Sequence, residues 1–363
     1  MRKMLVRLYK ARVPVLFWGP PGVGKTATRE AFAREVGAVL ILPAIRNPED
    51  IAVPVVREGG PRMEPIGEFA RAAALAEEGE EVIVFIDELT TLPPAAQGAA
   101  LRFLDSGVVG GVRIPPSVWR IAAANPPELA AGGYDLEAPT ANRLVHIEWQ
   151  LDPLEWADGF VGYWGRPPKV GDLAESEWAR ARALVAGFIR SHPDLLIRVP
   201  EDPVSRGQAW PSPRTWDFAS RVLASFDGDP REAATAIIGA VGKAAGLQFV
   251  EWAVRLNLPT VEELLADPEG VLDRVSSDAV YTLLAGAGAV LRDRLLEAKG
   301  ADMQELWGAA WRVAKVAARY CRDIAAGTLV HELCSLVRER GWRVPGDALA
   351  PYVELLRQAG ALS

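Results

Sequence analysis

Apolar runs alternate with helical segments in the first part of this chain. Five short runs rich in apolar residues predict strands, at residues 13–18, 39–42, 82–86, 119–124 and 145–149. Helical segments at residues 26–36, 69–78 and 94–104 lie between them. The last begins with prolines, which the first turn of a helix tolerates. Continuous apolar strands separated by helices predict a parallel sheet buried on both faces.

The second part of the chain has a different pattern. A stretch rich in Pro, Gly and Trp at residues 151–171 predicts the exit from the first domain, and strand signals almost vanish after it. Helical periodicity is present at residues 173–190, 213–226, 231–244, 279–296, 303–324 and 330–340. The pattern therefore predicts an α/β domain followed by a mainly helical half.

Composition and charge restrict the class of protein. Half of the 363 residues are hydrophobic and 24% are charged, as in ordinary globular proteins. The net charge of −7 provides no overall field that would attract nucleic acid or an anionic membrane. Residues 1–10 lack the apolar core of a signal peptide, and no run reaches the about 18 apolar residues that span a bilayer. Cys321 and Cys334 show no metal-binding spacing, so we expect buried free thiols in a cytoplasmic protein.

The strongest motif follows the first predicted strand. Residues 19–26 read GPPGVGKT and match the phosphate-loop pattern G-x-x-x-x-G-K-[ST] at every position. Glycines let the backbone N–H groups surround phosphates, and the N-terminus of the following helix favours anions. We expect Lys25 to reach the β- and γ-phosphates and the Thr26 hydroxyl to coordinate Mg²⁺. The expected nucleotide-binding residues are Gly19, Pro20, Pro21, Gly22, Val23, Gly24, Lys25, Thr26 and Ala27.

Two acidic residues end the strand at residues 82–86. Asp87 and Glu88 stand at its carboxyl end, where sheets of this class bind their ligands. Asp87 is expected to hold Mg²⁺, and Glu88 to polarise the water that attacks the γ-phosphate. An acidic pair after an apolar run is a weak signal by itself, but the preceding phosphate loop makes it a prediction of nucleotide hydrolysis.

Asn125 ends the strand at residues 119–124. We expect its amide to lie between Glu88 and the γ-phosphate and to orient the attacking water. The alternative interpretation is an Asn-Pro turn that only terminates the strand.

The order of these motifs resembles the AAA+ ATPases, and specifically their MoxR-like branch. The resemblance rests on GPPGVGKT, VIVFIDELT, IAAANPPE, Gly132-Gly133-Tyr134 before Ala141-Asn142-Arg143, and Pro211-Ser212-Pro213-Arg214-Thr215-Trp216. It implies ATP with Mg²⁺ as cofactors and a P-loop NTPase three-layer core with a parallel sheet. An all-helical lid and a C-terminal helical region would follow. The expected division is a core at residues 1–160, a lid at 161–255 and a helical region of unknown role at 256–363.

The resemblance also implies a homo-hexameric ring with nucleotide between subunits. Arg143 matches the arginine that a neighbouring subunit inserts against the γ-phosphate, and Arg214 matches the arginine that senses this phosphate within its own subunit. Arg102 and Arg120 are alternative interface arginines. The alternative for Arg143 is a surface arginine that caps a helix end, and for Arg214 an ordinary residue at a helix start.

Two insertions are similar to those of the same branch. Residues 45–66 interrupt the region after the second strand, and residues 107–116 predict a β-hairpin with Gly110-Gly111 near its turn. Both could equally be plain surface loops.

The expected function is Mg²⁺-dependent ATP hydrolysis that remodels or matures a client protein. The resemblance implies a partner with a von Willebrand factor A domain. One alternative is a nucleic-acid motor or loader of the same fold, which the acidic charge disfavours. The other is a low-turnover scaffold switched by nucleotide.

Overall fold

The computed structural model describes residues 2–129, 133–136, 141–165, 169 and 171–358. The chain divides into two compact units, Met1–Leu151 and Asp152–Ser363. The predicted boundaries at residues 160 and 255 stay predictions.

A five-stranded parallel sheet lies at the centre of the first unit, with the strand order β2-β5-β8-β1-β9. The strands are β1 (Val15–Trp18), β2 (Val39–Ile41), β5 (Val82–Ile86), β8 (Trp119–Ala124) and β9 (Val145–Glu148). The helices are α1 (Arg2–Ala11), α2 (Lys25–Val36), α3 (Gly67–Glu77) and α4 (Pro94–Ser106), with 3-10 turns η1 (Pro48–Asp50), η2 (Leu89–Thr91) and η3 (Pro127–Leu129). The predicted strands are confirmed with small shifts at their ends.

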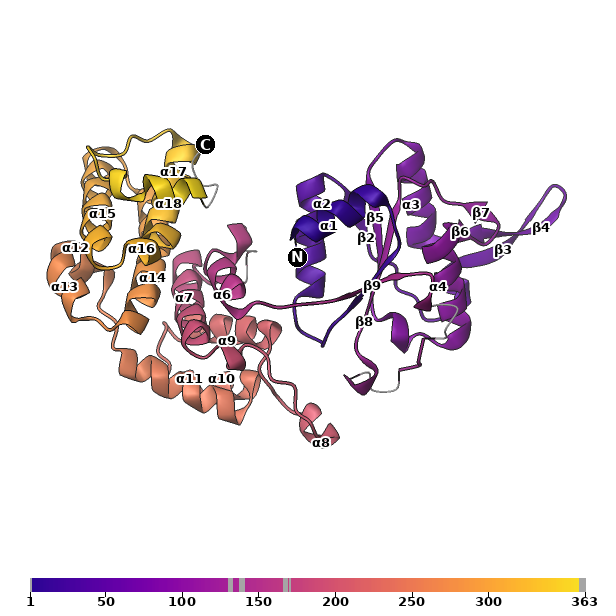
Figure 1. Cartoon of the computed structure of the whole chain (residues 1–363), viewed down its shortest axis with the longest axis horizontal. Helices are drawn as coiled ribbons and strands as arrows, with labels where there is room; N and C mark the ends of the chain where they lie inside the picture. The colour runs from indigo at the N-terminus through magenta and orange to yellow at the C-terminus, as the bar shows by residue number, and fades with distance from the viewer. Residues whose placement is uncertain (1, 130–132, 137–140, 166–168, 170, 359–363) are drawn as a thin grey trace. The chain divides into compact units, whose positions relative to one another are not determined.

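Helices cover both faces of this sheet, as Figure 1 shows. Successive side chains of a strand point to opposite faces. In β5, Val82, Val84 and Ile86 join the core formed with α3 and α4, whereas Ile83 and Phe85 join the core formed with α1 and α2. The three-layer α/β core with a parallel sheet is therefore confirmed.

Helix α1 was not among the predicted elements. Its Leu5 and Tyr9 are buried, and the Tyr9 ring makes edge contacts with Phe32 and Trp119. The hydrophobic pattern does not predict it because its buried stripe is short and is interleaved with basic residues.

Two hairpins extend from the first unit (Figure 1). The insertion at residues 45–66 contains the antiparallel pair β3 (Ala52–Arg57) and β4 (Gly60–Pro65), and the predicted hairpin at 107–116 is confirmed as β6 (Val108–Val109) and β7 (Val112–Arg113). The hairpins touch, because Gly111 N donates to Met63 O at 3.2 Å. A Cβ at Gly110, which has φ +61°, would lie 2.7 Å from Met63 O. Glycine is therefore required where the hairpins meet.

The second unit contains helices and no strand among its described residues. Its α-helices are α6 (Pro153–Val161), α7 (Glu175–Ser191), α8 (Pro203–Arg206), α9 (Pro213–Ser225), α10 (Ala234–Val241), α11 (Lys243–Leu256), α12 (Val261–Ala266), α13 (Pro268–Arg274), α14 (Ser277–Glu297), α15 (Gly300–Tyr320), α16 (Arg322–Gly327), α17 (Leu329–Arg340) and α18 (Val353–Gln358). The 3-10 turns are η4 (Tyr163–Gly165), η5 (Pro193–Leu195) and η6 (Ala350–Tyr352).

Two predicted helices are wrong in their continuity. The helix expected at residues 231–244 is interrupted at Gly242, whose φ of +85° ends α10 before α11 begins. The helix expected at residues 303–324 is interrupted at Cys321 without a glycine or proline to mark the break. Helix α6 lies within the segment that was expected only to be a domain exit.

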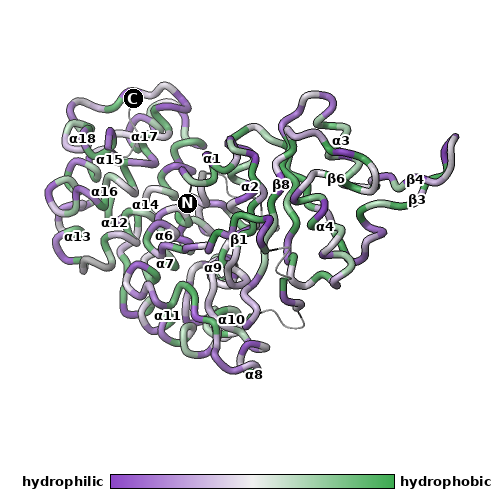
Figure 2. Tube along the Cα trace, turned by 45° about the vertical axis from the view of Figure 1, so that its right-hand side comes forward, coloured by the Kyte–Doolittle hydropathy of each residue, from purple (hydrophilic) through white to green (hydrophobic). Residues whose placement is uncertain are grey.

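Residues of α12 to α18 share one hydrophobic core, which includes Trp311 and Tyr352. Cys334 is buried and Cys321 half-buried, and both are free thiols as expected. Figure 2 shows hydrophobic residues along β8 and hydrophilic ones at the end of the β3–β4 hairpin. No helix in the described part of the chain combines the length and apolar character that crossing a bilayer requires.

Candidate active site

The phosphate loop connects β1 to α2. Gly22 and Gly24 have φ of +79° and +89°, in the left-handed region that glycine adopts without strain. Gly24 is the N-cap of α2 and has no side chain with which to cap it, so the first N–H groups of the helix are left to bind an anion. The loop therefore has the backbone geometry that phosphate binding requires.

Gly19 fixes this loop to the sheet. Its N–H donates to Ala124 O at 3.2 Å, and a Cβ at this position would lie 2.9 Å from Trp149 Cβ. That separation is too short for two carbons, so only glycine fits here. The loop is thus held between the ends of β8 and β9.

Lys25 is buried, with 9% of its surface exposed. Its ammonium donates to Gly19 O at 2.5 Å, to Pro20 O at 3.2 Å and to Asn125 Oδ1 at 3.0 Å. The structure therefore brings Lys25 and Asn125 together, although they are far apart in the sequence.

Asp87 and Glu88 follow β5 directly. Asp87 is half-buried, and its Oδ1 accepts the backbone N–H of Glu88 at 3.0 Å. Glu88 is exposed and has a left-handed backbone with φ +52°. Its carbonyl accepts the N–H and the hydroxyl of Thr91, each at 2.8 Å. A non-glycine residue with such a backbone is strained, and strain of this kind is concentrated at functional positions.

The strand order explains why these groups meet. Strand β8 lies between β5 and β1, with Ile86 opposite Ala122 and Trp18 opposite Ala124. The carboxyl ends of parallel strands lie at one edge of a sheet. The groups that follow β1, β5 and β8 therefore share that edge.

The residues present fit a magnesium nucleotide. Asp87 supplies a carboxylate oxygen, which Mg²⁺ prefers, close to a loop shaped for phosphates. The side chain of Thr26, the other expected ligand, lies outside the described part of the structure. In that described part, no group of three or more His, Cys, Asp and Glu residues could hold a metal. A single carboxylate, that of Asp87, beside a phosphate-binding loop suits an ion that is bound jointly by the protein and the phosphates.

The three candidate interface arginines differ in their surroundings. Arg143 is exposed, and its Nε lies 3.8 Å from Asp105 Oδ2. Arg102 is exposed on α4. Arg120 instead donates to the carbonyls of Phe103 and Asp105, each at 3.1 Å, and burial lowers its pKa. Arg120 thus caps the carboxyl end of α4, whereas Arg143 and Arg102 are exposed.

Arg214 belongs to the second unit and is exposed in the first turn of α9. The Ser212 hydroxyl accepts the Thr215 N–H at 3.3 Å, and Thr215 Oγ1 accepts the Ser212 N–H at 2.8 Å. This capping box fixes the start of the helix that carries Arg214. Its predicted role as a phosphate sensor stays a prediction. Gly132, part of the motif before Arg143, lies outside the described residues.

The structure adds Arg29, which the sequence analysis missed. Arg29 is 9% exposed, and its Nη1 lies 3.0 Å from Asp87 Oδ2. A signal was present in the sequence, because position 29 is one helical turn after Lys25 and in line with the apolar Phe32 and Ala33. A charged residue on the buried stripe of a helix requires a partner.

Comparison with known proteins identifies the segment that carries these groups. Residues 15–127 match the family described as "ATPase family associated with various cellular activities (AAA)". A "Putative 26S proteasome regulatory subunit homolog" of Methanocaldococcus jannaschii is 35% identical over 122 residues, which is 32% of this chain and 30% of that protein. The Holliday junction branch migration complex subunit RuvB of Campylobacter fetus is 31% identical over 99 residues, 26% of this chain and 24% of that protein. The chain thus spans less than a third of each of these curated relatives.

Solved structures are also similar to this chain. A Thermotoga maritima RuvB mutant is 16% identical with a TM-score of 0.37, and covers 73% of this chain and 74% of its own. Likenesses this weak support no conclusion about function. The family match nevertheless includes the phosphate loop, Asp87, Glu88 and Asn125. Residues 15–127 therefore match the AAA family of ATPases, and the groups of the candidate site lie within this segment.

Proposed function

We propose that this chain is a ring-forming ATPase that hydrolyses ATP with Mg²⁺ and uses the energy to remodel a client protein. One observation carries the proposal. The phosphate loop, Asp87, Glu88 and Asn125 lie at one edge of the sheet of an AAA domain, and Lys25 is hydrogen-bonded to Asn125.

Each group has a role in this proposal. The phosphate loop and Lys25 bind the β- and γ-phosphates. Thr26 and Asp87 would hold Mg²⁺, which neutralises charge on the phosphates when bound. Glu88 polarises the attacking water, and Asn125 orients it. The exposed carboxylate of Glu88 is suited to a base that meets its water at the surface of the domain.

A neighbouring subunit would complete the site. We propose that Arg143 acts in trans on the γ-phosphate of the next subunit and that Arg214 senses this phosphate in cis. Arg143 is exposed, and its contact with Asp105 is a long surface ion pair of the kind that contributes little stability. Such a contact can be exchanged for a phosphate at little cost.

The client and partner are proposed from the motifs and the hairpins. MoxR-like relatives act with proteins that contain a von Willebrand factor A domain, and the β6–β7 hairpin is a feature of that branch. We therefore propose a homo-hexamer that matures a client protein with such a partner. The β3–β4 and β6–β7 hairpins, which touch at Gly110, are the surfaces proposed to meet the client.

A nucleic-acid motor is the second candidate. It is favoured by the curated RuvB relative from Campylobacter fetus, which aligns with 26% of this chain and is named for branch migration of Holliday junctions. The net charge of −7 opposes it. A motor of this kind would bind DNA with an affinity that falls steeply with salt, whereas a protein remodeller would show no such binding. The low-turnover scaffold would bind ATP and release little phosphate.

The test is steady-state phosphate release from ATP and Mg²⁺, with mass photometry of the same sample. Turnover by ring-sized particles, lost in Lys25→Ala, supports the proposal. Turnover that survives Lys25→Ala would place the activity at another site. A monomer that binds ATP without turnover would support the scaffold instead.

A further inference from the structure

Arg29 is the feature that the proposed reaction does not use. It lies on α2 one turn after Lys25, on the helix face turned to the sheet. Its guanidinium carbon is 3.9 Å from the centroid of the Phe85 ring, and its Nη1 donates to Asp87 Oδ2 at 3.0 Å. The charge is thus held between an apolar ring and the carboxylate at the end of β5.

This charge has few other partners. Burial lowers the pKa of Arg29 and the neighbouring Asp87 raises it, but arginine remains protonated under physiological conditions. Its Nε is buried and has no hydrogen-bond partner among the described residues. The Asp87 carboxylate is therefore the main group that compensates this buried cation.

The same carboxylate is the proposed magnesium ligand. Its Oδ1 accepts the Glu88 N–H and its Oδ2 accepts Arg29. A divalent ion that approached Asp87 would compete with the guanidinium for the lone pairs of the carboxylate. The two cations would also repel each other.

We propose that Arg29 is a positioning residue that holds the Asp87 carboxylate and weakens its interaction with Mg²⁺ in the nucleotide-bound site, so that the metal binds less tightly beside the phosphates. The inference rests on the proposed function, because it concerns the same site. The proposed role follows from the position of the Arg29 charge beside Asp87 and requires no conformational change.

The test measures how strongly metal and nucleotide support each other's binding. The dissociation constant of a fluorescent ADP is measured in EDTA and in Mg²⁺. The constant in EDTA divided by the constant in Mg²⁺ gives the coupling to the metal. Arg29→Met keeps the apolar stem over Phe85 and removes the charge. We expect this variant to increase the ratio about tenfold, the scale on which outer residues change metal affinity. ADP avoids turnover, and a general loss of structure would change both constants and leave their ratio unchanged.

Controls separate charge from packing. Arg29→Lys keeps the charge and should leave the ratio near that of the wild type. Arg34→Met is the same substitution at an exposed site of α2 and should change nothing. Asp87→Asn should bring the ratio close to one, with or without Arg29. If circular dichroism shows that Arg29→Met does not fold, Arg29→Gln serves as the neutral variant.

The outcomes distinguish the two proposals. A ratio that is unchanged or smaller in the neutral Arg29 variant overturns the role of Arg29 and leaves the ATPase proposal intact. A wild-type protein that does not bind ADP refutes the proposed function itself.

Discussion

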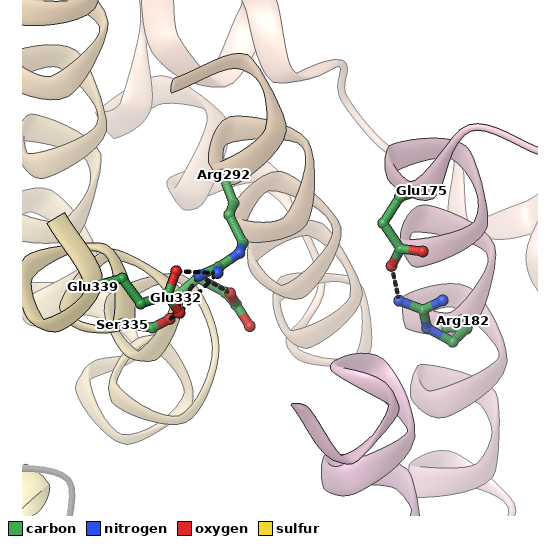
Figure 3. Close-up of polar contacts among 6 residues, drawn as sticks. All are labelled: Glu175, Arg182, Arg292, Glu332, Ser335 and Glu339. Carbon is green, nitrogen blue, oxygen red and sulfur yellow. Dashed lines mark hydrogen bonds and ion pairs between the residues drawn. The ribbon is translucent and has the colours of Figure 1, made fainter. Parts of the chain in front are cut away.

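Two buried arginines, one in each unit, have the same kind of surroundings. Arg29 in the first unit and Arg182 in the second are 9% and 1% exposed. Each guanidinium lies over an aromatic ring, Arg182 at 4.4 Å from the Trp178 centroid. Each is paired with a carboxylate. Arg182 Nη2 lies 2.7 Å from Glu175 Oε1, and Figure 3 shows this pair. Burial and charge pairing alone do not distinguish them.

The position of the partner does distinguish them. Glu175 lies on α7, the same helix as Arg182, and the second acceptor of Arg182 is the carbonyl of Val161 at the end of α6, at 2.9 Å. That arrangement fastens two helices together. The partner of Arg29 is instead the carboxylate beside the phosphate loop. A buried charge therefore indicates function only when its partner belongs to a site.

The largest effect is expected from an exposed arginine. Arg143→Ala should lower turnover by about 10³-fold or more if the side chain stabilises the transition state in trans. The melting temperature should change little, because a long surface ion pair contributes little stability. Phosphate release and calorimetry measure the two effects.

Mixed rings provide the control for Arg143. Arg143→Ala subunits combined with Glu88→Gln subunits should recover part of the activity, once sizing shows that both variants assemble. Arg102→Ala tests the alternative interface arginine. Full turnover in Arg143→Ala and its loss in Arg102→Ala would transfer the role to Arg102.

The next largest effect is on stability. Arg182→Met removes the hydrogen bond from α7 to the Val161 carbonyl of α6 and the pair with Glu175, whose side chain is 40% exposed. Because the Val161 carbonyl loses its donor while Glu175 can turn to water, we expect a cost of about 1–3 kcal/mol. The calorimetric transition of the helical unit should move to lower temperature, whereas ADP affinity below that transition should stay unchanged. A large loss of ADP affinity in a folded Arg182→Met protein would contradict the conclusion that Arg182, unlike Arg29, only links helices.

A smaller effect is expected at Asn125. Asn125→Ala removes the acceptor of the Lys25 hydrogen bond and the group proposed to orient the water, and misplaced reactants lose about 10²-fold in rate. ADP should still bind. Unchanged turnover would support the alternative interpretation, in which Asn125 only ends the strand.

The smallest effect is expected at the α14–α17 contact in Figure 3. Arg292 donates to Ser335 at 2.6 Å and to Glu339 at 2.7 Å, and this contact holds the pKa of Glu339 below its ordinary value. Arg292→Met should cost about 1 kcal/mol, as for partly exposed pairs. Because a lowered carboxyl pKa stabilises the fold above the ordinary pKa of the group, the difference should disappear as the pH falls through the lowered value. Calorimetry at neutral and acidic pH tests this, and a cost that stays constant would contradict the role of Glu339.

Much of the first unit could be predicted because its patterns are local. The apolar run at residues 82–86 is short, continuous and followed by Asp87 and Glu88, so strand and site residues appear together in the sequence. The phosphate loop is likewise determined by the spacing of its glycines and Lys25. The pairing of Lys25 with Asn125 depends on strand order, which the motifs imply only through the resemblance.

The missed features depend on contacts distant in sequence. Cys321 interrupts a helix without a local breaking residue, and Gly242 resembles many glycines that helices tolerate. Arg29 could be recognised only as a charge on a buried stripe, because its partner is 58 residues away. Such a charge can be noticed in a sequence, but its partner requires the fold.

The central claim is that Glu88 activates water for ATP hydrolysis at this site. The most direct measurement is phosphate release by the wild type and by Glu88→Gln at saturating ATP and Mg²⁺, with bound nucleotide measured in the same samples. We predict that Glu88→Gln retains bound ATP and loses at least about 10²-fold in turnover, as removal of a general base does. Equal turnover in the two proteins would contradict the account.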